Sequence, residues 1–223
     1  MNVVRRLRSS VYDAVIVPMT STWYAAVLAR LEPGSRLLDV GIGTGAALVA
    51  HAAAVRDQRL QVTGIDIDAD YVARGREAVS AAGLEGRVRV KLESVYDCGG
   101  GPYDAAYFSG SFMLLPDPAA ALRHVATLLA PKGRVFFTQT FEHETNRMLE
   151  VLKPLLRLAT TIDFGRVTYE ADFRRAVEEG GLAVLAKEVL HAGRRRSSVL
   201  VVAGRPGLCE RFPREAERRP SRR

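Results

Sequence analysis

The stretch Leu37–Gly45, with the sequence LLDVGIGTG, decides the fold of this chain. An apolar run passes through the acidic residue Asp39 and is followed by glycines at positions 41, 43 and 45. Glycine tolerates positive φ and lets the backbone approach a ligand closely. The pattern AALVA then opens a helix, whose first N–H groups are unpaired and attract an anion. The stretch therefore predicts a strand, a ligand-binding turn and a helix in direct succession.

Short apolar segments alternate with helical patterns along the rest of the chain. A helix is predicted over residues 68–82, because Gly83 is suited to a left-handed cap. Further strands are predicted at 60–66, 88–92, 103–108, 133–139, 182–190 and 197–203. This alternation, with 48% hydrophobic residues in 223, indicates a globular α/β protein with a mainly parallel sheet.

In their order, these segments resemble the class I S-adenosylmethionine (SAM)-dependent methyltransferases of the small-molecule type. Residues 37–45 are similar to motif I of that family, and LLAPKGR at 128–134 is similar to its approach to the fifth strand. The similarity covers roughly residues 36–140. A nicotinamide dinucleotide is the alternative ligand, since Gly41, Gly43 and Ala46 also fit its fingerprint. Asp39 argues against it, because a carboxylate repels a pyrophosphate and attracts the ammonium and sulfonium groups of SAM.

The resemblance implies a doubly wound, mainly parallel seven-stranded sheet with helices on both faces and a C-terminal antiparallel hairpin. We expect a single methyltransferase domain over residues 1–204. Within it, cap helices in 1–35 and an insertion at 142–166 are expected to cover the substrate side, and amphipathic helices that simply pack on the sheet are an equal alternative for most of these residues. Residues 205–223, rich in Arg, Glu and Pro, are expected to form a basic, disordered tail.

The predicted cofactor residues follow the carboxyl ends of the strands, where open α/β sheets bind ligands. Asp66 ends the second strand about twenty residues after the turn, where a ribose needs a bidentate acceptor. Ser94 occupies the place where class I enzymes often carry an acid for the adenine amino group, with Glu93 just before it. The Ser94 hydroxyl and the Val95 backbone are therefore the expected adenine contacts. The full predicted set is Asp39, Gly41, Gly43, Thr44, Gly45, Asp66, Ile67, Ser94, Val95, Ser109 and Gly110, with no metal ligand.

The loop after the fourth strand is expected to flank the methyl group. Gly110 permits close approach there, and Phe112 and Met113 are expected to form an apolar wall. Methyl transfer is an in-line SN2 displacement, in which holding the nucleophile near the methyl carbon supplies much of the catalysis. A hydroxyl acceptor also needs a base. His143, just after the fifth strand, is the catalytic candidate because it titrates near neutrality, and a solvent-exposed loop histidine is an equal alternative.

The net charge of +7 lies at the two ends of the chain. Arg5, Arg6 and Arg8 supply three positive charges and residues 205–223 a surplus of four, so residues 9–204 are formally neutral. A neutral body lacks the basic face of a nucleic-acid binder. The expected partner is thus an unidentified small-molecule acceptor, with no nucleic acid and no membrane span. A SAM-binding regulatory or partner subunit without its own turnover is the alternative function.

Cysteine and hydropathy patterns indicate the compartment. Cys98 and Cys209 are the only cysteines, too few for a disulfide framework or a zinc site. No apolar run approaches the length that spans a bilayer. We therefore expect a reducing, cytoplasmic location, with organellar targeting by the Arg-containing N-terminus as the alternative.

Overall fold

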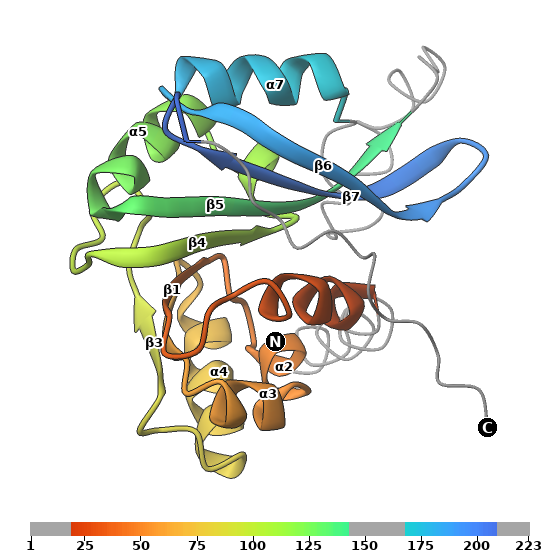
Figure 1. Ribbon diagram of the computed structural model, residues 1–223. Coiled ribbons are helices and arrows are strands. Elements are labelled where there is room, and N and C mark those ends of the chain that lie inside the picture. Colours follow the sequence, from red (N-terminus) through yellow and green to blue (C-terminus); the bar gives the residue numbers. More distant parts are fainter. Residues whose placement is uncertain (1–18, 143–167, 209–223) are drawn as a thin grey trace, which may run out of the picture.

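A computed structural model describes residues 19–142 and 168–208, in which seven strands form one sheet of order β3-β2-β1-β4-β5-β7-β6 (Figure 1). The strands are β1 Arg36–Val40, β2 Gln61–Asp66, β3 Val88–Leu92, β4 Tyr103–Ser109, β5 Leu129–Glu142, β6 Ala183–Ala192 and β7 Arg196–Gly204. Strands β1 to β5 pair in parallel, whereas β7 is antiparallel to both β5 and β6. The predicted mainly parallel sheet with a C-terminal antiparallel hairpin is confirmed.

Helices cover both faces of this sheet (Figure 1). One face carries α5 and α7, and the other carries a helix that includes residues 19–28, together with α2, α3 and α4. The bounds are α2 Ala46–Val49, α3 Ala52–Asp57, α4 Ala69–Ala81, the 3-10 turn η1 Phe112–Leu114, α5 Pro118–Leu128 and α7 Glu170–Glu179. None of the helices in the described ranges combines the length and the hydrophobicity that crossing a bilayer requires.

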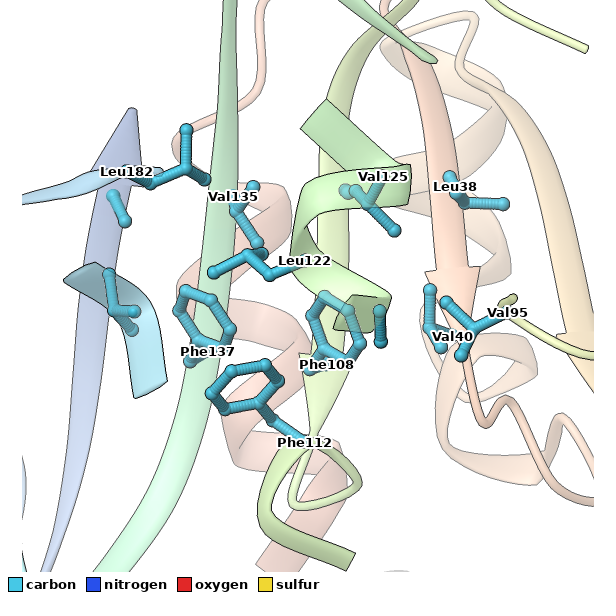
Figure 2. Close-up of a cluster of buried hydrophobic side chains, with 14 of the residues drawn as sticks. Leu38, Val40, Val95, Phe108, Phe112, Leu122, Val125, Val135, Phe137 and Leu182 are labelled. Carbon is cyan, nitrogen blue, oxygen red and sulfur yellow. The ribbon is translucent and has the colours of Figure 1, made fainter. Parts of the chain in front are cut away.

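Two hydrophobic cores lie on the two faces, and successive strand residues alternate between them. Leu38 and Val40 of β1 belong to the core under α5 and α7 (Figure 2), whereas Leu37 belongs to the core under the helix at 19–28. Asp39 therefore points toward the helix at 19–28, as its contact with Tyr24 shows. Since both faces are covered, β1 and β4 are buried along almost their whole length rather than at alternate residues.

The helix α4 is brought close to the glycine turn by a small residue. Asp68 caps α4 by accepting hydrogen bonds from the backbone of Asp70 and Tyr71, as a short acidic residue at an N-cap does. A Cβ at Gly75 would lie 3.3 Å from the carbonyl oxygen of Gly43. Glycine at this position therefore allows α4 to pack directly against the turn that follows β1.

Strand β5 is longer than the segment 133–139 that the sequence predicts. It begins at Leu129, which pairs with Tyr103 of β4, and the register shifts before Ala105 meets Arg134. A Cβ at Gly133 would lie 2.9 Å from the carbonyl oxygen of Tyr103. Glycine thus lets the link with sequence APKG continue the strand through an irregular pairing, which hydropathy alone does not reveal.

The folded body continues past Gly204. Arg205 donates to the backbone carbonyls of Ala126 and Ala130 at the end of α5 and the start of β5. The predicted insertion at 142–166 and the base candidate His143 lie outside the described residues, apart from Glu142. Residues 209–223 of the predicted tail lie outside them as well.

Candidate cofactor site

The three glycines of the turn all have positive φ, at 78° for Gly41, 60° for Gly43 and 66° for Gly45. A Cβ at Gly41 would lie 2.8 Å from the Cβ of Ser111, so the space there is filled by the loop after β4. A Cβ at Gly43 would meet nothing within 4 Å. The turn therefore needs glycine for its backbone shape and presents an open position at its centre.

Asp39 is fully buried, with 0% of its surface exposed. Its Oδ2 accepts a hydrogen bond of 2.6 Å from the Tyr24 hydroxyl, while its Oδ1 is buried and has no hydrogen-bond partner. Burial raises the pKa of Asp39 to about 7, the Tyr24 hydrogen bond lowers it, and the charge of Asp66 raises it. Because unsatisfied buried polar atoms are rare in proteins, Oδ1 is the kind of atom that a ligand amino group satisfies.

Asp66 links the end of β2 to the glycine turn. Its Oδ2 accepts from the backbone N–H of Gly43 and its Oδ1 from that of Asp68, both at 2.9 Å. Each carboxylate oxygen keeps further acceptor capacity for a ligand hydroxyl. The sequence predicts Asp66 as a ribose contact but does not reveal its hydrogen bond to the turn, which joins residues 23 apart.

Glu93, Ser94 and Val95 follow directly after β3. The Ser94 hydroxyl oxygen accepts from the backbone N–H of Tyr96 at 3.2 Å, and Val95 packs beside Val40 in the core (Figure 2). Glu93 Oε1 accepts from Lys91 at 3.1 Å, but Glu93 Oε2 is buried without a partner. Glu93 is not among the contacts predicted from the sequence, because the family position of the adenine acid falls on Ser94.

The loop after β4 lies against the glycine turn. Ser109 is the register partner of Thr138 on β5. Gly110, which has a φ of 68°, donates its N–H to the Thr138 carbonyl at 2.9 Å. The Ser111 hydroxyl donates to the carbonyl of Val40 at 2.6 Å. This bond connects the ends of β1 and β4. Because β3, β2, β1 and β4 are parallel neighbours in the sheet, the predicted residues that follow them lie at the same edge.

Phe112 does not form the predicted apolar wall. It is buried, and its ring lies 4.8 Å from that of Phe137 and 5.6 Å from that of Phe173, inside the core under α5 and α7 (Figure 2). Leu114, two residues later, is 55% exposed instead. The prediction for Phe112 was wrong because an apolar loop residue suits a core and a ligand wall equally well.

Exposed apolar side chains gather after the strands that carry the site. The described residues expose five large apolar side chains, and three of them are Ile67 after β2, Leu92 at the end of β3 and Leu114 after β4. Ile67 is 78% exposed. All three follow or end strands at the carboxyl edge of the sheet, where open α/β sheets bind ligands.

A comparison with protein families identifies the class of protein to which this chain belongs. The family model described as "Methyltransferase domain" matches residues 19–187, which is most of the chain. The chain therefore belongs to the methyltransferase family. It is an enzyme of the class I, SAM-dependent type, as the order of its sheet and its glycine turn indicate.

Individual relatives place the chain among enzymes with diverse acceptors. It is 29% identical over 152 residues to a phosphatidylethanolamine N-methyltransferase of Cereibacter sphaeroides, covering 66% of this chain and 72% of the relative. It is 37% identical over 118 residues to a ubiquinone biosynthesis O-methyltransferase of Xanthomonas axonopodis pv. citri (strain 306). That match covers 50% of this chain and 46% of the relative, so the chain spans about half that relative's length.

Solved structures share the fold. The [4+2]-cyclase SpnF superimposes with a TM-score of 0.67 at 19% sequence identity, covering 83% of this chain and 81% of the other. Identity this low supports the fold alone. Because that neighbour is a cyclase by name, the same fold carries more than one chemistry.

Proposed function

We propose that this enzyme transfers the methyl group of SAM to a small, largely apolar acceptor. One observation supports the proposal above the others: the turn after β1 is open at Gly43, and the Asp66 carboxylate at the end of β2 accepts a hydrogen bond from the Gly43 backbone N–H. The residues proposed to hold the cofactor are Asp39, Gly41, Gly43, Thr44, Gly45, Asp66, Ile67, Ser94, Val95, Ser109 and Gly110. A single domain over residues 1–204, with caps at 1–35 and 142–166, is part of the same proposal.

The available atoms fit the chemical groups of SAM. Asp39 Oδ1 lacks a partner and is suited to the amino group, and the remaining acceptor capacity of Asp66 suits the ribose hydroxyls. Exposed Ile67 offers an apolar surface to the adenine ring. The Ser94 hydroxyl and the Val95 backbone are the proposed adenine contacts. Glu93 Oε2 is an additional acceptor for the adenine amino group.

Bound SAM supplies an electrophilic methyl group on a sulfonium. The chain contributes by orienting the acceptor and by excluding water, since positioning accounts for much of the rate of such a displacement. If the acceptor is a hydroxyl, His143 is the proposed base, because it directly follows β5 in the sequence and an imidazole is a suitable general base. Turnover of the His143→Ala variant on the identified acceptor, with SAM binding measured in parallel, decides that role.

The nature of the acceptor is proposed from the loop after β4. Leu114 lies in the 3-10 turn that follows β4 and is exposed, and we propose that it offers an apolar surface to the acceptor. The relatives named for phosphatidylethanolamine and for ubiquinone biosynthesis act on acceptors whose chemistry is consistent with such a surface. Charge excludes a nucleic-acid acceptor from the proposal, because residues 9–204 are formally neutral.

Incubation with isotopically labelled SAM and a metabolite extract, followed by mass spectrometry, tests the proposal. Label in an apolar metabolite, with stoichiometric formation of S-adenosylhomocysteine (SAH), is the expected result. Label in nucleic acid or protein would contradict the proposed acceptor class. SAM binding without any labelled product would favour the alternative of a subunit that lacks its own turnover.

Replacing Asp66 by Ala is expected to weaken SAH binding by roughly 10- to 100-fold, or about 1.5–3 kcal/mol, the range for hydrogen bonds to a charged group. The variant loses the proposed ribose contacts and also the hydrogen bond that holds Gly43. Isothermal titration calorimetry measures the change. Asp57→Ala, which removes an exposed acid at the end of α3, is the matched control and should bind as the wild type does. Equal affinity of Asp66→Ala and the control would place the ribose elsewhere.

A further inference from the structure

The helix at 19–28 reaches the end of β1 through Tyr24, which is 2% exposed. Besides donating to Asp39 Oδ2, Tyr24 packs edge-on against the ring of Tyr107, with centroids 5.0 Å apart. Tyr107 is itself held by a 2.8 Å hydrogen bond with the hydroxyl of Thr138. Edge-to-face packing of this kind fixes the plane of a ring. The Tyr24 hydroxyl is therefore kept on one oxygen of Asp39, and the other oxygen is left without a partner.

No positive charge faces Asp39 from the described elements packed around it. The groups that act on it are Tyr24 from the helix, Asp66 from β2 and Tyr107, its neighbour in register on β4. Two of these are neutral phenols and the third is an acid. A buried carboxylate without a cation is costly, so the neutral carboxyl is favoured more strongly here than in an exposed aspartate. Burial accordingly raises the pKa of Asp39 to about 7.

We propose that Asp39 is a proton-linked acceptor for the amino group of the methyl donor, and that Tyr24 is the residue that positions it. This inference rests on the proposed function, because it assumes that SAM binds at the end of β1. As the cationic amino group arrives beside Oδ1, the proton of the Asp39 carboxyl leaves for the solvent. The Tyr24 hydroxyl stabilises the resulting carboxylate by donating to Oδ2. It thereby lowers the fraction of Asp39 that is protonated at neutral pH before the ligand binds.

The affinity for the methyl donor should then depend on pH in a definite direction. Protonation of Asp39 competes with the cation, so the affinity should rise as pH rises toward 7 and then level off. With a pKa of about 7, the dissociation constant is expected to fall roughly tenfold between pH 5.5 and 7. The ligand's own amino group begins to lose its proton at higher pH, as α-amino groups do above about 7.7. The effect of Asp39 on the affinity is therefore best measured between pH 5.5 and 7.5.

Calorimetric titration of the full chain with SAH, in two buffers of different ionisation enthalpy, tests the proposal. At pH 7 we expect release of roughly half a proton for each SAH bound, and a dissociation constant that falls roughly tenfold from pH 5.5. Asp39→Asn should bind more weakly and lose most of this pH dependence. Tyr24→Phe should shift the profile to higher pH and weaken binding roughly tenfold at pH 7, because the donor that favours the carboxylate is gone.

Tyr103→Phe is the matched control, because Tyr103 stands at the opposite end of β4 and its hydroxyl donates to the loop carbonyl of Gly99. It should keep the wild-type profile. Affinity that is flat between pH 5.5 and 7 while SAH still binds, or a Tyr24→Phe profile equal to that of the wild type, would overturn the inference. A wild-type protein that binds no SAH at any pH would contradict the proposed function itself. Thermal unfolding confirms that each variant is folded.

Discussion

Asp39→Asn should raise the free energy of unfolding by about 2–4 kcal/mol above pH 7. The pKa of Asp39 is raised from 3.8 to about 7 in the folded protein, because the carboxyl is buried. The folded state therefore holds a proton that the unfolded chain has already lost. The stability that this bound proton contributes is fully present below pH 3.8 and is lost as pH rises through 7. Asn stays neutral throughout and keeps an oxygen that can accept the Tyr24 hydrogen bond.

Urea denaturation of the wild type and the variant at pH 4 and pH 8 checks this expectation. The difference between the two proteins should be small at pH 4 and should grow to its full size at pH 8. Asp57→Asn, an exposed acid on α3, serves as the control and should change stability little at either pH. An Asp39→Asn variant that is no more stable than the wild type at pH 8 would contradict the expected cost of burying this carboxylate. A gain in stability, together with weaker SAH binding, would show that Asp39 is retained for function at a cost in stability.

Gly41→Val should destabilise the fold by about 3 kcal/mol or more. Gly41 has a φ of 78°, which a β-branched residue adopts only with strain, and a Cβ there would lie 2.8 Å from the Cβ of Ser111. Ser111 cannot move freely, because its hydroxyl is bonded to the carbonyl of Val40. The substitution therefore combines backbone strain with a steric clash between the ends of β1 and β4.

Gly34→Val separates these two effects. Gly34 has a similar φ of 83°, but a Cβ there meets nothing within 4 Å. This variant should lose only the roughly 1–2 kcal/mol of a left-handed conformation. Urea denaturation of both variants gives the comparison. Equal losses would mean that the contact between Gly41 and Ser111 carries no energetic weight.

Local patterns were enough to predict most of the strands and helices, whereas the seven-stranded sheet and its C-terminal hairpin followed from the resemblance to the methyltransferase family. The alternation of apolar strands and helices, and the glycine turn after Asp39, each depend on neighbours along the chain. The helix predicted at 68–82 appears as Ala69–Ala81 with Asp68 as its cap, because capping chemistry is also local. The irregular start of β5 was missed, since it depends on how Gly133 fits against Tyr103 of another strand.

The environment of the candidate site was harder to predict than its location. The sequence places Asp39 and Asp66 at strand ends, but the Tyr24 hydroxyl reaches Asp39 only through tertiary packing of a separate helix. The bond from Ser111 to Val40 spans 71 residues and has no signal in the sequence. Contacts of this kind determine the ionisation of Asp39 and the shape of the turn, so they are found only when the elements are assembled.

The most direct test of the central claim is a pair of calorimetric titrations, one with SAH and one with NAD. We expect SAH to bind and NAD to bind far more weakly or not at all, because Asp39 and Asp66 favour a cationic ligand over a pyrophosphate. Binding of NAD with an affinity comparable to that of SAH would contradict the assignment of this turn to SAM.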